Sequence, residues 1–136
     1  MQFATFVLRA SALAFFGVGA AFLVAPASMA GFVGISLGDA SADNDMRAVY
    51  GGLQLACGAL LWTASRRIEW LRPGLFAQLV LFAGLATGRI VSWGVVGLPD
   101  ALGIVLHAAE LLALAAGFAA WLRMRRETVA GVGRTS

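Results

Sequence analysis

Four apolar stretches fill most of this 136-residue chain, and their lengths constrain the fold more than any other feature of the sequence. Each is close to the ~20 residues that a helix needs to cross ~30 Å of hydrocarbon. They cover about residues 3–25, 46–64, 73–93 and 98–121. We therefore expect an all-α fold: a bundle of four transmembrane helices in a single integral membrane domain over residues 1–136, with residues 122–136 as a basic cytoplasmic tail.

The amino-acid composition agrees with a membrane protein. Hydrophobic residues make up 60% of the chain and charged residues 12%, whereas a soluble domain carries about twice that charged fraction. Cys57 is the single cysteine and lies within the second stretch, so it has no partner for an internal disulfide. We expect it to be a small buried side chain that gives no information on the redox compartment.

The basic residues, which are all arginines, predict the orientation of the helices. Most follow the second or the fourth stretch: Arg66, Arg67, Arg72, Arg123, Arg125, Arg126 and Arg134. The other two connections carry aspartates, which are Asp39, Asp43, Asp45 and Asp100. Arginine is enriched on the cytoplasmic side, so we expect a multi-pass membrane protein with both termini in the cytoplasm. Topology then explains the net charge of +3, and we expect no nucleic-acid partner.

The N-terminal stretch has one feature of a secretory signal peptide, because the small residues 26–30 follow an apolar run. The basic segment that opens such a peptide is missing, since the only early charge is Arg9, inside the run. We therefore expect the stretch to be retained as a helix that ends before Pro26, with Arg9 extending to the cytoplasmic surface. Residues 31–35 are too apolar for a free loop and are expected at the membrane interface.

Small residues at four-residue spacing predict where the helices touch, because they let two backbones approach closely. The pairs are Gly84 with Gly88, Gly52 with Ala56, and Ala109 with Ala113. Together they indicate compact helix packing, and they carry no chemistry.

Two prolines and two polar residues are assigned structural roles. Pro73 and Pro99 suit the first turns of the third and fourth helices. Asp100 is expected to be a helix-start residue. Gln78, which lies in the third stretch, is expected to make a packing contact.

Polar side chains inside the apolar stretches are the most specific feature of the sequence. In the second stretch they recur on one helix face, and in the third and fourth they stand three residues apart. They are Arg47, Tyr50, Gln54, Arg89, Ser92, His107 and Glu110. At ~1.5 Å of rise per residue, all of them lie in the outer half of the membrane or near its midplane. We interpret them as candidate ligand-binding residues of one polar pocket that opens to the non-cytoplasmic side.

Arg89 and Glu110 have two interpretations. As a structural pair, opposite charges lower the cost of placing each other in hydrocarbon, and loss of one leaves the other unpaired. As a working site, Glu110 binds or exchanges a proton as the candidate catalytic acid/base, while Arg89 or Arg47 holds an anionic or carbonyl group. His107 and one Glu are too few ligands for a closed metal site, so we expect no metal and no cofactor.

The sequence resembles a known family in the RAVYGGLQL segment at 47–55, the GRIVS segment at 88–92 and Glu110. These residues are similar to those of the domain-of-unknown-function 4345 family, small four-helix bacterial membrane proteins that are broadly similar to DoxX-like proteins. The resemblance covers nearly the whole chain, including Pro26 after the first helix. It implies the four-helix fold and a location in the bacterial inner membrane, and it draws attention to the same polar residues. It supplies no reaction, because the role of the family is not established.

Three classes of function agree with the sequence. The first is a non-catalytic protein that binds membrane lipid, a small lipophilic ligand or a membrane partner, as a homo-oligomer or as an accessory subunit. The second is a membrane-embedded isomerase or hydrolase of a lipophilic substrate, which needs one well-placed carboxylate with polar partners. The third is a proton-coupled transporter, for which four short helices would have to oligomerise to enclose a pathway.

Overall fold

The computed structural model describes the backbone of residues 1–132 and the side chains of residues 1–126. Within that part of the chain every regular element is a helix, so the expected all-α fold is confirmed. In chain order the elements are α1 (Gln2–Val24), α2 (Pro26–Phe32), α3 (Ala40–Asp45), the π-helix η1 (Met46–Gly52), α4 (Leu53–Ala64), the 3-10 helix η2 (Ile68–Trp70), α5 (Leu71–Val96) and α6 (Ala101–Val132). Arg134, expected in the basic tail, lies outside the described residues.

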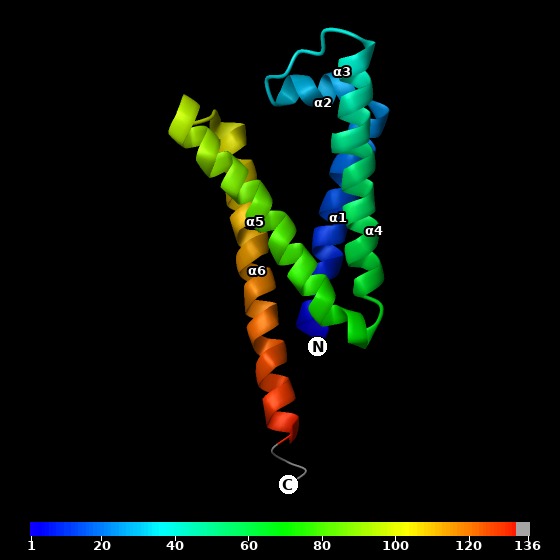
Figure 1. Cartoon of the computed structure of the whole chain (residues 1–136), viewed down its shortest axis with the longest axis vertical. Coiled ribbons are helices and arrows are strands. Elements are labelled where there is room, and N and C mark those ends of the chain that lie inside the picture. The colour runs from blue at the N-terminus through cyan, green and yellow to red at the C-terminus, as the bar shows by residue number, and fades with distance from the viewer. Residues whose placement is uncertain (133–136) are drawn as a thin grey trace.

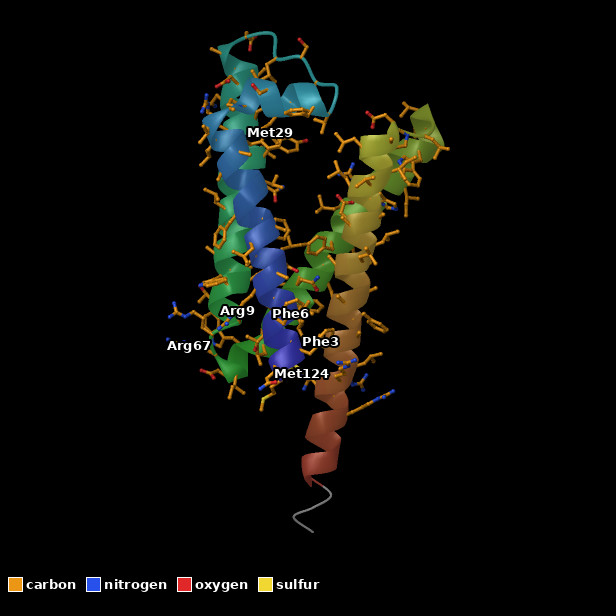
Figure 2. The ribbon with its side chains drawn as sticks, turned by 180° about the vertical axis from the view of Figure 1, so that it is seen from behind. Phe3, Phe6, Arg9, Met29, Arg67 and Met124 are labelled. Carbon is orange, nitrogen blue, oxygen red and sulfur yellow. The ribbon has the colours of Figure 1, made fainter. Side chains whose placement is uncertain are left out.

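The helices form two pairs that meet at one end and diverge towards the other (Figure 1). In the α1–α4 arm, α1 packs against η1 and α4, and in the α5–α6 arm, α5 packs against α6. The start of α1, the end of α4 and the start of α5 lie at the joined end, whereas α2, α3 and the α5–α6 connection lie at the open end. The view from behind shows the same divergence (Figure 2). The described chain is therefore two joined helix pairs.

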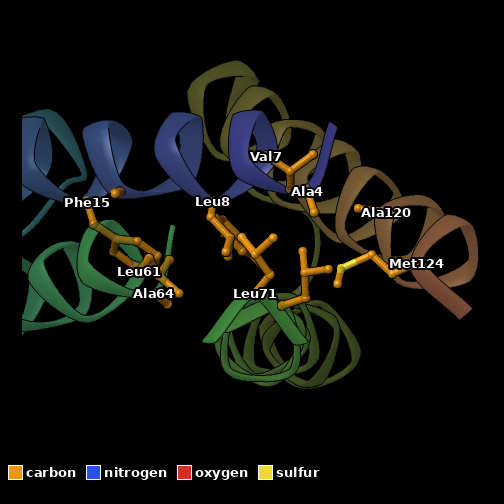
Figure 3. Close-up of a cluster of buried hydrophobic side chains, with 12 residues drawn as sticks. Ala4, Val7, Leu8, Phe15, Leu61, Ala64, Leu71, Ala120 and Met124 are labelled. Atoms are coloured by element: carbon orange, nitrogen blue, oxygen red, sulfur yellow. The ribbon is translucent and has the colours of Figure 1, made fainter. Parts of the chain in front are cut away.

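The hydrophobic core lies where the two arms meet (Figure 3). Leu8 of α1, Leu61 of α4 and Leu75 of α5 are fully buried there. The rings of Phe15 and Phe82 belong to the same cluster, with centroids 5.4 Å apart. Because lipid tails are as apolar as these side chains, close van der Waals contact would hold the arms together in a membrane.

Close helix contacts use glycines outside the expected pairs. A Cβ at Gly74 of α5 would lie 2.5 Å from Cβ of Ala64, which shows how tightly the end of α4 meets α5. A Cβ at Gly84 or Gly88 would have no neighbour within 4 Å, so the expected helix contact through this pair is wrong. The four-residue spacing puts both glycines on one face, but α5 packs through a different face.

The helix ends follow from capping and turn residues. Pro73 lies in the first turn of α5 as expected, whereas Pro99 precedes α6 and is not in its first turn. The reason is Asp100, whose Oδ1 accepts a hydrogen bond from the backbone N of Gly103 at 2.8 Å and caps the helix. Its expected role as a helix-start residue is confirmed. Gly97, at φ +95°, ends α5 in a conformation that favours glycine.

Three helical segments are long and apolar enough to cross a membrane: α1, residues 68–96 and residues 101–126. The other expected stretch, residues 46–64, is helical throughout but is divided between η1 and α4. It continues a helix that begins with α3, where Oδ1 of Asp39 accepts from the backbone N of Ala42 at 2.9 Å. These lengths and compositions are those of a membrane protein.

Candidate functional site

The two charges deepest in the apolar stretches form a pair between α5 and α6. Nε of Arg89 donates to Oε1 of Glu110 at 2.9 Å and to Oε2 at 2.8 Å. The antiparallel course of the two helices, which reverse direction at Gly97, brings these residues opposite one another. The sequence left open whether they are paired, and the structure shows that they are.

The pair is asymmetric in its exposure. The side chain of Arg89 is 33% exposed and that of Glu110 is 11% exposed. An arginine carries five N–H donors, and among the described residues only the Nε of Arg89 has an acceptor. No described residue accepts a hydrogen bond from Nη1 or Nη2 of Arg89. The carboxylate is therefore buried, while the outer edge of the guanidinium stays available to another molecule.

His107 extends the pair along α6, one turn before Glu110. Its Nδ1 lies 3.7 Å from Oε2 of Glu110, which is too far for a hydrogen bond. Among the described residues this buried Nδ1 has no hydrogen-bond partner. The imidazole and the ring of Trp93 of α5 form a T-shaped contact, with centroids 4.6 Å apart and an interplanar angle of 64°. A buried polar atom without a partner is costly, and such atoms are uncommon in folded proteins.

Gln78 is a second polar residue of the α5–α6 interface and is fully buried. Its Nε2 donates to the carbonyl of Ala113 at 2.8 Å, which agrees with the expected packing role. A Cβ at Gly117 would lie 1.9 Å from Oε1 of Gln78, so this amide fits only against a glycine. Gln78 joins the two helices and is not one of the groups that Arg89 contacts.

Arg47 lies on the other arm and ties three helices together. Its Nε donates to Oδ2 of Asp43 in α3 at 2.8 Å. Its Nη1 donates to the carbonyl oxygen of Leu23 in the last turn of α1. Carbonyls of the last turn have no partner within their own helix and carry the negative end of the helix dipole. These contacts give Arg47 a structural role at the junction of α1, α3 and η1.

The remaining candidates do not join the Arg89 pair. The ring of Tyr50 packs on Phe22, with centroids 5.2 Å apart. Gln54 is half-buried on α4, and no described residue hydrogen-bonds its side chain. Ser92 is exposed on α5. The R-x-x-Y-G-G segment that begins at Arg47 coincides with the π-helix η1, a rare conformation that is frequent at functional sites.

The structure corrects the expectation of one common pocket. It brings Arg89, His107 and Glu110 together between α5 and α6, and it puts the candidates of the second stretch on the α1–α4 arm. Sequence reasoning did not identify Trp93 as a neighbour of His107. Its position could have indicated this contact. Trp93 lies one turn after Arg89, and an antiparallel α6 that pairs Glu110 with Arg89 brings His107 beside that turn of α5.

The side chains of this cluster can form hydrogen bonds and exchange protons. Within the described part of the chain, no group of three or more His, Cys, Asp or Glu residues is arranged to hold a metal ion. The guanidinium of Arg89 can donate to an oxygen of a ligand, and the carboxyl group of Glu110 can gain or lose a proton. His107 can do either at Nδ1.

Comparison with known proteins identifies one family. A family model described as "domain of unknown function (DUF4345)" matches residues 3–122, which is most of the chain. No curated protein and no solved structure matches the chain. The broader similarity to DoxX-like proteins is not tested by this match and stays a prediction.

Proposed function

The chain belongs to the domain of unknown function 4345 family, and from this premise we propose that it is an integral membrane protein that binds a small lipophilic molecule through Arg89, His107 and Glu110. The observation that carries the proposal is the outer edge of the Arg89 guanidinium, which has no partner among the described residues. Polar N–H groups in hydrocarbon are costly when unpaired, so a ligand oxygen that accepts from them gains free energy on binding.

The charges of the cluster favour a ligand with a carbonyl group. Arg89 and Glu110 balance one another, so their pair has no net charge. A neutral carbonyl oxygen adds no charge in a medium of low dielectric constant, and the planar guanidinium holds it with directed hydrogen bonds. The unpartnered Nδ1 of His107 offers a further hydrogen bond to the same molecule. The apolar remainder of the ligand would lie against the bilayer.

We further propose that the protein crosses a bacterial inner membrane four times and that both termini lie on the cytoplasmic side. The spans are α1, the continuous helix of η1 and α4, α5 and α6. The arginines after α4 and near the end of α6 gather at the joined end of the arms, and the aspartates lie at the open end. This distribution supports an orientation with the joined end in the cytoplasm. The exposed apolar residues after α2, which include Val33 and Ile35, suit the opposite interface.

An enzyme that uses Glu110 as a general acid/base is the second candidate. Its specific support is Nδ1 of His107, which is unpartnered and 3.7 Å from Oε2 of Glu110. A small movement of either side chain would close this gap. The two groups could then exchange a proton with each other and with a substrate held by Arg89. A binding protein releases its ligand unchanged, whereas an isomerase or hydrolase releases a product, and this difference separates the two candidates.

Native mass spectrometry of mildly extracted protein tests the proposal. We expect the wild type to retain a small molecule and Arg89→Lys to lose it, because lysine keeps the positive charge beside Glu110 but lacks the planar fork. Arg125→Lys, at an exposed arginine of α6, is the matched control and should retain the molecule. Equal retention by both variants would contradict the proposal. The same spectra report whether the chain forms a homo-oligomer or co-purifies as an accessory subunit.

A further inference from the structure

A groove at the joined end of the arms is separate from the Arg89 cluster. It has a volume of about 560 Å³ and lies between the first half of α1 and the start of α5. Phe6, Leu13 and Ile68 line it, and each has at least 60% of its surface exposed. Arg9 provides a positive charge in the same groove. Figure 2 shows Phe6 and Arg9 close together on α1, with Arg67 beyond them.

We infer that this groove binds one acidic phospholipid, with the phosphate on Arg9 and an acyl chain along Phe6, Leu13 and Ile68. The inference is independent of the proposed function, because none of the residues that line the groove belongs to the Arg89 cluster. The first support is the positioning of the Arg9 guanidinium. Its Nε donates to Oγ of Ser65 at 3.4 Å, and its Cζ lies 5.6 Å from the centre of the Trp62 ring.

Within the described part of the chain, no acidic side chain balances the charge of Arg9. No described carboxylate forms an ion pair with it, in contrast to Arg89, which Glu110 neutralises. Ser65 and Trp62 hold one side of the guanidinium, and its Nη groups have no partner among the described residues. An anion that accepts from these nitrogens would balance the charge and complete the hydrogen bonding.

The surroundings of the groove favour a phosphate of the membrane surface. Arginines dominate the joined end, where Glu69 is the acidic residue with a described side chain. The arginines are Arg66, Arg67, Arg72, Arg123, Arg125 and Arg126. Clusters of this kind beside membrane helices attract acidic headgroups. Trp62 and Trp70, at the same end, are residues that favour the depth of the headgroups.

The apolar part of the groove explains why a phospholipid fits better than a free anion. Exposed Phe6 and Leu13 stand two turns apart on α1, with Arg9 one turn from each, so apolar surface for an acyl chain flanks the arginine along the helix. Inorganic phosphate would use only the arginine. A lipid uses both parts, and it reaches the groove from within the bilayer.

The test counts lipids retained by full-length protein in native mass spectrometry after reconstitution in bilayers of phosphatidylglycerol or of phosphatidylcholine. We expect wild type to retain one phosphatidylglycerol and no phosphatidylcholine, and Arg9→Gln to retain phosphatidylglycerol roughly tenfold more weakly, as for loss of one charge-assisted contact. Arg125→Gln removes the same charge outside the groove, so it should weaken lipid binding far less than Arg9→Gln does. Inorganic phosphate should not displace it.

A second variant keeps the proposal testable if Arg9→Gln does not fold. Ala10→Trp leaves Arg9 intact and places a bulky side chain in the groove, so it should also lose the lipid. Equal loss from Arg9→Gln and Arg125→Gln would show that binding follows total charge, and this would overturn the proposal. Equal retention of the two lipids, displacement by inorganic phosphate, or full retention by Ala10→Trp would each overturn it as well.

Discussion

Nε of Arg89 donates to both carboxylate oxygens of Glu110, at 2.9 and 2.8 Å, and thereby joins α5 to α6 in the part of the α5–α6 arm that lies away from the core. The geometry combines the two interpretations that the sequence left open. One side of the guanidinium holds the carboxylate, as a structural pair does. The other side has no partner among the described residues and is therefore available to a ligand.

Replacement of Glu110 by glutamine should destabilise the protein. It removes the charge that balances Arg89 and leaves the guanidinium without a counter-charge between apolar helices, at an expected cost of about 1–3 kcal/mol. Thermal unfolding in detergent measures the effect. Glu69→Gln, at an exposed residue of η2, is the control and should leave the midpoint unchanged. Equal midpoints for both variants would show that the pair does not stabilise the fold.

Gly117→Ala should disrupt the contact between α5 and α6. The new Cβ would lie 1.9 Å from Oε1 of Gln78, and the amide would have to leave its hydrogen bond with the carbonyl of Ala113. Overpacking of this kind costs about 1–3 kcal/mol. Gly84→Ala is the matched control, since its Cβ has no neighbour within 4 Å and alanine favours a helix. If both variants unfold at the same temperature, the packing of Gln78 against Gly117 is incorrect.

Arg47→Gln should loosen the α1–α4 arm without affecting the Arg89 cluster. The variant loses the ion pair with Asp43 and the hydrogen bond to the carbonyl of Leu23. Hydrogen exchange in detergent should therefore rise in α3 and η1 and stay unchanged in α5 and α6, which serve as the internal control. Faster exchange around Arg89 would show that the two arms share one polar site after all.

Labelling of single cysteines tests the proposed orientation. In a Cys57→Ala background, Ser41→Cys of α3 should react with a membrane-impermeant maleimide added to cells with a permeabilised outer membrane. Glu69→Cys of η2 should react only after the inner membrane is lysed. Both native residues are exposed, so their reactivity reports the side of the membrane. The reverse pattern would place the joined end outside the cell.

The sequence predicted the helices because apolar length is a local property of the chain. The helices match the first three stretches closely, whereas α6 continues past residue 121 to Val132, into the segment expected as a tail. Asp100 performs the expected capping. The glycine spacing at Gly84 and Gly88 did not identify the contact face, because a helix of this composition is apolar on every side. The contact face of α5 is instead set by how Gln78 fits against Gly117, which depends on the shape of both helices.

The candidate site was predicted only in part for a related reason. Arg89, His107 and Glu110 come together because α5 and α6 are consecutive and antiparallel, which the sequence implies. Arg47 lies apart from the Arg89 cluster because the two arms diverge, and no residue pattern in the sequence predicts the angle between them. The π-helical course of η1 was also not predictable, since no residue type in this segment distinguishes i→i+5 from i→i+4 hydrogen bonds.

The most direct test of the central claim is an experimental structure of the protein extracted with its own lipids into nanodiscs. We predict density for a small molecule between α5 and α6, with an oxygen within about 3 Å of Nη1 or Nη2 of Arg89. The carboxylate of Glu110 should remain on Nε. An empty site, with the outer edge of Arg89 facing only acyl chains or paired with another protein group, would contradict the claim.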